Sequence, residues 1–205
     1  MGNAKNSLDK LIEIIPGGVF GIISVIIVLT GDIISIVLFP EGYSFFENMI
    51  SELGSGPYGI IFNLGLIFSG IISIPYYFSL YRSFDEENTN IFLRKSAITF
   101  SGISIISYIL VGVFPSIEEN YIVFVTHGIF AFLAFLTGIL YLTTFSILML
   151  LDNKWSKLRS YHGFVAAGSY LLILLTWLPI TEWIATIAII SWIIANSIFM
   201  LYHKI

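Results

Sequence analysis

Cysteine is absent from this chain of 205 residues. Its absence excludes a disulfide framework, thiolate zinc sites, iron–sulfur clusters and cysteine nucleophiles. It also removes the usual indicator of the redox compartment. The chain must therefore build its stability and any chemistry from other side chains.

Charge is scarce as well. Charged residues make up 11% of the chain and hydrophobic residues 57%, whereas a soluble domain has about 25% charged and about 45–50% apolar residues. This composition excludes an ordinary soluble globule, and the high hydrophobicity excludes disorder. The net charge of −4 offers no basic face for nucleic acid. A polytopic membrane protein remains.

Six apolar stretches are long enough to cross a bilayer core of about 30 Å, which takes about 20 helical residues. They are continuous rather than alternating, which favours helices over the strands of a membrane barrel. The first stretch is too long for the core of a signal peptide and lacks a cleavage pattern. We therefore expect an all-α, polytopic membrane protein with a single domain over residues 1–205. Its expected transmembrane helices are residues 16–39, 57–81, 97–114, 122–151, 161–178 and 183–202.

All Lys and Arg residues fall on one side of this six-span arrangement, and the three loops on the other side contain none. Cytoplasmic loops of membrane proteins are rich in Lys and Arg. We therefore expect a multi-pass protein of the cell membrane with its N- and C-termini in the cytoplasm. The basic residues are Lys5, Lys10, Arg82, Arg94, Lys95, Lys154, Lys157, Arg159 and Lys204.

The opposite, outer loops are acidic. Their acids either simply accompany the topology or form a vestibule that would attract cations or protons. The odd-numbered spans end at Pro40, Pro115 and Pro179, and proline stops a helix. We therefore expect three helical hairpins with acidic outer turns. The outer acids are Glu41, Glu47, Glu52, Glu118, Glu119 and Glu182.

The first outer loop is predicted to form a short interfacial helix over residues 44–53. Ser44 and Glu47 have the spacing of a capping box, and Gly54 is suited to end the helix. The apolar residues share one face, which would lie on lipid or on the bundle. The polar residues share the other face, which either meets water or covers the space between the spans. They include Glu47, Asn48, Ser51 and Glu52.

Asp32 and His127 are ionisable groups within the predicted spans. They lie about 12 Å and about 8 Å below the outer ends of their helices, at 1.5 Å per residue. A carboxylate at the bilayer centre costs about 2.5–3.5 kcal/mol on insertion scales. A stripe of glycine and serine residues beside Asp32 permits close helix packing, so we expect Asp32 to face the bundle. A direct Asp32–His127 pair, either functional or structural, is one expectation.

Other polar residues have weaker signals. Asn63 lies in the same outer half, and the sequence leaves open whether it has a function or only bonds a neighbouring helix. For Asn196 in the last span we expect the helix–helix bond. For Glu182 we expect a place in the first turn of its helix, where the helix dipole favours a carboxylate.

No familiar catalytic or metal-binding motif is present. A metal site is conceivable, because Asp32, Glu47, Glu52 and His127 include ligand types that suit zinc, manganese or magnesium. No metal-binding motif supports it, so no metal ligand is assigned and metal binding stays open. Ser51 is not in a nucleophile elbow. His127 is the only outer histidine, which excludes a bis-histidine haem there. The sequence leaves the cofactor unknown.

Residues 46–54, Phe-Glu-Asn-Met-Ile-Ser-Glu-Leu-Gly, are followed by Phe62-Asn63 before a glycine-rich span. Later come Gly112-Val113-Phe114-Pro115 and Thr126-His127-Gly128. Over about residues 17–203, these segments resemble an uncharacterised prokaryotic membrane family, that of domain of unknown function 998. Glu52 stands where that family usually has Asp. The resemblance implies six helices but does not point to any particular activity. It singles out Asn48, Ser51, Glu52, Asn63 and His127.

Three functions stay open. The working hypothesis is an outer-leaflet site that binds or acts on a lipid-like substrate, with His127 as the acid–base and Asp32 and Glu52 as catalytic carboxylates. The alternatives are a proton- or cation-coupled transporter and a non-catalytic membrane scaffold or accessory subunit. The expected partners are the lipid bilayer and a second copy of the chain. The residues that would bind the substrate are Glu47, Asn48, Ser51 and Asn63.

Single-cysteine variants test the expected orientation, since no native cysteine interferes. In intact cells, Glu119→Cys should react with a membrane-impermeant maleimide, because its loop carries no base and is expected outside. Asn153→Cys should react only after lysis. Labelling of Asn153→Cys in intact cells would contradict this orientation.

Overall fold

The computed structural model describes residues 7–40, 42–84 and 89–204; Lys5 and Glu41 lie outside these ranges. The described chain is entirely helical, with no strand in those ranges. Its α-helices are α1 (Ser7–Ile14), α2 (Gly17–Val37), α3 (Gly59–Arg82), α4 (Ile91–Val113), α5 (Tyr121–Leu151), α6 (Lys157–Thr176) and α7 (Pro179–His203), and a 3₁₀ helix η1 covers Ile50–Gly54.

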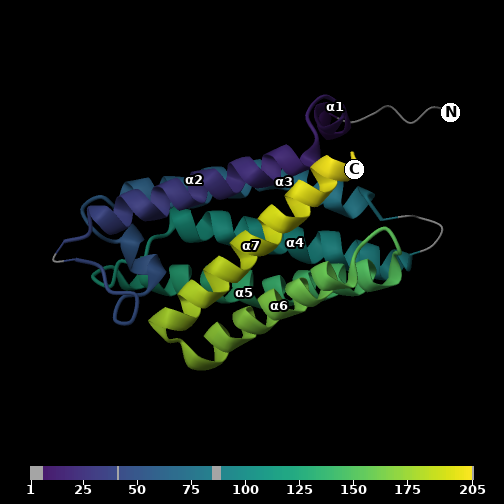
Figure 1. Ribbon diagram of the computed structural model, residues 1–205. Coiled ribbons are helices and arrows are strands. Elements are labelled where there is room, and N and C mark those ends of the chain that lie inside the picture. The colour runs from purple at the N-terminus through teal and green to yellow at the C-terminus, as the bar shows by residue number, and fades with distance from the viewer. Residues whose placement is uncertain (1–6, 41, 85–88, 205) are drawn as a thin grey trace.

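The six long helices form a closed ring. Each packs on the next along the chain, and α7 returns to pack on α2 (Figure 1). Because α3 also packs on α4 and α5 on α6, the arrangement of three hairpins is not confirmed. The described connecting residues 38–40, 42–58, 114–120 and 177–178 lie at one end of the ring, which we call the loop end. The other end, beside α1 and the last turn of α7, is called the α1 end (Figure 1).

Five of these helices, α2, α3, α4, α5 and α7, have the length and apolar composition to cross a membrane. The chain is therefore an integral, multi-pass membrane protein. Helix α6 is 20 residues long but begins with Lys157 and Arg159 and carries further polar residues in its first half. It does not join the five, so the expected count of six spans is not confirmed.

Two helices begin earlier than the hydrophobic pattern indicates. Helix α4 begins at Ile91 rather than at 97, because the side chain of Asn90 caps it by accepting from the Phe92 N–H at 2.8 Å. Helix α7 begins at Pro179, where a missing N–H costs nothing. Before it, α6 ends at Thr176 and Trp177 adopts a left-handed conformation with φ 51°. Pro179 thus starts a helix rather than stopping one.

The prediction of a continuous short helix over residues 44–53 is wrong. Turns occupy its first part, and the regular structure is the five-residue helix η1. The expected cap does not form at Ser44. Instead the Ser44 N–H donates to the Asn48 side chain at 3.1 Å, which closes a turn. Ile50 and Leu53 are buried toward the bundle, whereas Phe46 is exposed.

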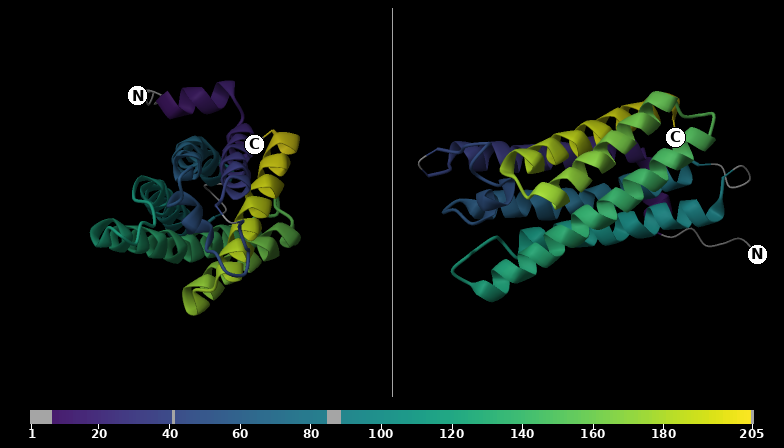
Figure 2. Two further views of the ribbon diagram at one scale, coloured as in Figure 1. Left: turned by 90° about the vertical axis from the view of Figure 1, so that its left-hand side faces the viewer. Right: turned by 90° about the horizontal axis from the view of Figure 1, so that it is seen from below.

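A short helix that the sequence did not indicate precedes the ring. Helix α1 runs across the long helices at its end of the bundle (Figures 1 and 2). Its Asp9 accepts a hydrogen bond from the Arg82 guanidinium at the end of α3, with 2.6 Å between the two atoms. This ion pair links α1 to the ring.

A cluster of large buried side chains fills the α1 end of the ring. Tyr141 on α5 has its ring 6.4 Å from that of Trp192 on α7, and Phe145 packs near both. Edge-to-face and tilted aromatic packing of this kind adds stability beyond the buried area. Side chains therefore pack closely between the helices at this end of the bundle.

The small-residue stripe on α2 lies where helices touch. A Cβ built on Gly31 would lie 3.3 Å from the Cα of Gly65 on α3 and 3.3 Å from the Ile61 carbonyl oxygen. A Cβ on Gly21 would clash with Ser197 on α7. Gly31 lets α2 approach α3 backbone to backbone, and Gly21 makes room for side chains of α3 and α7, as small residues do between membrane helices.

The Gly31 crossing can be tested by adding side-chain volume. Gly31→Val should lower the stability of the purified protein by about 1–3 kcal/mol, because rigid backbone faces the new atoms. Thermal unfolding in detergent would show the change. Gly102→Val is the matched control, since nothing lies within 4 Å of a Cβ at that glycine. Equal unfolding temperatures for the two variants would contradict the packing argument.

Candidate functional site

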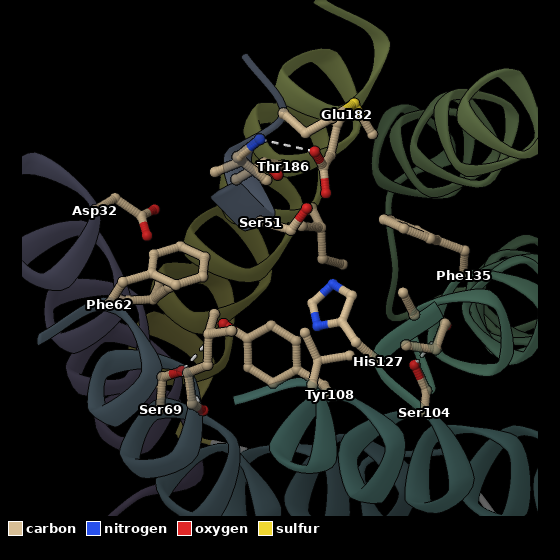
Figure 3. A pocket seen from close by; sticks show the side chains of 18 of the residues that line it. Asp32, Ser51, Phe62, Ser69, Ser104, Tyr108, His127, Phe135, Glu182 and Thr186 are labelled. Carbon is tan, nitrogen blue, oxygen red and sulfur yellow. Dashed lines mark hydrogen bonds between the residues drawn. The ribbon is translucent and has the colours of Figure 1, made fainter. Parts of the chain in front are cut away.

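The ring encloses a cavity of about 450 Å³. All six long helices contribute to its lining, together with residues 49–52 of the first connection. Figure 3 shows side chains from these elements pointing toward a shared central space. Volumes of about 300–1,000 Å³ are typical of small-molecule sites.

The ionisable lining groups lie at the loop end. Asp32 comes from α2, Glu52 from η1, His127 from α5 and Glu182 from α7. Each helical one lies within about two turns of the loop end of its helix. The exposed Glu118 adds a further carboxylate. Among the described lining residues there is no Lys or Arg, so this end of the cavity is acidic.

Asp32 is the most isolated of these groups. Its side chain is 2% exposed, and neither carboxylate oxygen has a hydrogen-bond partner within the described structure. In Figure 3 its carboxylate points into the cavity beside the ring of Phe62. Burial of an ionised carboxylate without a partner is costly. Asp32 faces the bundle as expected, and both of its carboxylate oxygens are buried without a hydrogen-bond partner in the described structure.

The imidazole of His127 is oriented by a hydrogen bond to the backbone. Its Nδ1 lies 2.7 Å from the carbonyl oxygen of Phe114, and because a carbonyl only accepts, Nδ1 carries the proton. In the neutral ring, Nε2 then has the lone pair. The direct Asp32–His127 pair is not formed, since His127 bonds to backbone and Asp32 to nothing. The two line different walls of the cavity (Figure 3).

A roof of residues 43–54 covers the loop end and is tied to two helices. Glu182 on α7 accepts from the Ile50 N–H at 2.8 Å, and the Asn63 amide on α3 donates to the Gly54 carbonyl oxygen at 3.0 Å. Both bonds satisfy backbone groups that have left the regular helices. The roof is therefore fixed by side chains from other parts of the ring.

Bonds within the roof satisfy Glu52. Its Oε1 accepts from the Met49 N–H at 3.0 Å, and its Oε2 accepts from the Asn48 amide at 2.9 Å. The Trp183 indole donates to the Tyr43 hydroxyl at 2.8 Å, which donates to the Asn48 carbonyl oxygen at 3.0 Å. Burial raises the pKa of the Tyr43 phenol, so the phenol keeps its proton and remains a donor.

The candidate residues from the sequence thus separate into two groups. Asp32, Ser51, Glu52 and His127 line the cavity. The other three do not line it. Glu47 is exposed, Asn48 donates to Glu52 within the roof, and Asn63 donates to the Gly54 carbonyl oxygen of the roof. The sequence did not reveal that Glu182 bonds Ile50 and lines the cavity. Its available signal was a lone carboxylate next to Trp183 at the start of an apolar helix.

Deeper in the cavity the lining is apolar or carries hydroxyls that are already bonded. The hydroxyls of Tyr77 and Tyr141 lie 3.1 Å apart, and the Ser69 hydroxyl lies 3.2 Å from that of Tyr108. Ser104 donates to the Ala134 carbonyl oxygen at 2.9 Å. These hydroxyls already have hydrogen-bond partners within the protein. The remaining deep lining includes Val25, Val28, Leu66, Ile105, Ile189 and Ile193.

The fold and the cavity define an α-helical, multi-pass membrane protein with an internal site that is acidic at one end. The chain belongs to the family described as "Protein of unknown function (DUF998)", whose model matches residues 22–198. This match confirms the resemblance drawn from the sequence, and it contains every cavity residue discussed above. No curated protein and no solved structure matches the chain.

The tie between Glu182 and the roof can be tested by hydrogen exchange. Glu182→Ala removes the acceptor of the Ile50 N–H and should accelerate exchange of backbone amides in residues 49–54, because the roof opens more often. The exposed Glu119→Ala is the control and should leave the exchange unchanged. Unchanged protection in Glu182→Ala would show that the bond does not hold the roof.

Proposed function

We propose that the protein binds a lipid-like amphiphile in the cavity of the ring. The observation that carries this proposal is the polarity of the lining, which changes along one cavity from carboxylates and an imidazole to apolar side chains. A molecule with a polar head and an apolar tail matches this order. Its tail would replace water next to apolar surface, which stabilises the complex by about 25 cal/mol per Å² buried.

The head would lie at the loop end. There Asp32, Ser51 and His127 supply carboxylate oxygens, a hydroxyl and an imidazole within the same space (Figure 3). With both termini in the cytoplasm, as the basic residues predict, this end belongs to the outer leaflet. In this proposal His127, Asp32 and Glu52 are the groups next to the bound head, and any acid–base step would use the free Nε2 of His127.

A cation-coupled transporter is the second candidate, favoured by the carboxylates of the cavity. Transport requires a path to the opposite end of the ring. Beyond Tyr141 that path is filled by the buried side chains of Leu142, Phe145 and Trp192. The closed end supports binding over transport. A scaffold without a ligand is the third candidate, and it predicts no binding at all.

Filling the cavity tests the proposal. Ala131 lines the cavity from α5, and Leu136 on the same helix is 38% exposed and does not line it. Ala131→Phe should abolish binding of dodecanol and dodecylamine to the protein in lipid nanodiscs, measured by calorimetry, because the ring occupies the tail site. Leu136→Phe should bind as the unmodified protein does.

The same pair of variants corrects for partitioning of the amphiphiles into the bilayer. A heat signal that is identical in the unmodified protein, Ala131→Phe and Leu136→Phe would come from the lipid alone and would contradict the proposed function. Cation flux through proteoliposomes that Ala131→Phe abolishes would instead favour the transporter.

A further inference from the structure

We infer that the head of the bound amphiphile is a positively charged amine and that Asp32 is its counter-ion. This inference rests on the proposed function and specifies the chemical class of its ligand. It follows from an inventory of which polar atoms around the cavity are already bonded.

The carboxylates at the loop end are not equivalent. Both oxygens of Glu52 accept hydrogen bonds within the roof, and one oxygen of Glu182 accepts the Ile50 N–H. These two groups hold the protein together. Asp32 accepts nothing, although it is 2% exposed and points into the cavity (Figure 3). Among the buried carboxylates of the lining, Asp32 is the one whose two oxygens are both without a bond in the described structure.

The ligand must bring donors and positive charge to Asp32. No Lys or Arg is among the described residues that line the cavity, so the protein supplies no counter-ion. A protonated amine has donors for both oxygens and neutralises the charge at once. An anionic head would meet several carboxylates and no base, which costs free energy.

An organic cation fits the surroundings better than a metal ion. Within the described residues, no three His, Asp or Glu side chains are close enough to hold a metal. The aromatic ring of Phe62 lies beside Asp32 (Figure 3). Aromatic rings attract alkylammonium groups and are not metal ligands of choice.

Three probes with the same tail and different heads test the inference, namely dodecylamine, dodecanol and dodecanoate. In nanodiscs near neutral pH, dodecylamine should bind at least about tenfold more tightly than dodecanol, a difference of about 1.4 kcal/mol. Dodecanoate should bind most weakly. Asp32→Asn should remove the preference for the amine, so that dodecylamine and dodecanol bind about equally. It should fold, because Asp32 makes no hydrogen bond that the amide would lose.

The exposed Glu119→Gln is the matched control and should keep the full preference for dodecylamine. Equal binding of dodecylamine and dodecanol to the unmodified protein would overturn the inference and leave the proposed function standing. So would a preference for the amine that survives in Asp32→Asn. Absence of binding by all three probes would overturn the proposed function itself.

Discussion

The rest of the site depends on how the backbone between α2 and α3 is satisfied. Each backbone N–H and C=O that leaves a helix at the edge of the bilayer needs another partner. Here the partners are side chains from distant helices: Glu182 for the Ile50 N–H and Asn63 for the Gly54 carbonyl. These bonds hold the first connection across the loop end of the ring. Without them the space between the helices would be an open groove rather than a covered cavity.

Similar carboxylates at the loop end differ in how they are bonded. Glu52 and Glu182 accept hydrogen bonds from the roof, whereas Asp32 accepts none in the described structure. The distinction lies in their surroundings, since Asp32 is on a helix whose backbone is already bonded and Glu182 faces a loop that is not. A group that carries no structural bond can be adapted to a ligand at little cost to folding. Under the proposed function, specificity would depend on Asp32 and stability on Glu52 and Glu182.

The membrane character and the family follow from the sequence because a bilayer dictates the length and composition of the helices that cross it. The same pattern marked Asp32 and His127, since ionisable groups stand out in apolar runs. The roof did not follow. Its predicted cap at Ser44 is replaced by a turn in which the Ser44 N–H donates to the Asn48 side chain. The roof is held by a bond between Ile50 and Glu182, which are 132 residues apart. Local spacing carries no information on such a contact. Helix α1 was missed because a short helix held by an ion pair to Arg82 leaves no long apolar run.

Ring closure by α7 has a consequence for how the protein is made. The chain enters the membrane from its N-terminus, so α2 is present long before α7 arrives to pack on it. Until then Asp32 has no enclosed space to face, and the Ile50 N–H has no acceptor from Glu182. The bond that holds the roof therefore forms only after a segment 132 residues further along the chain has joined the bundle.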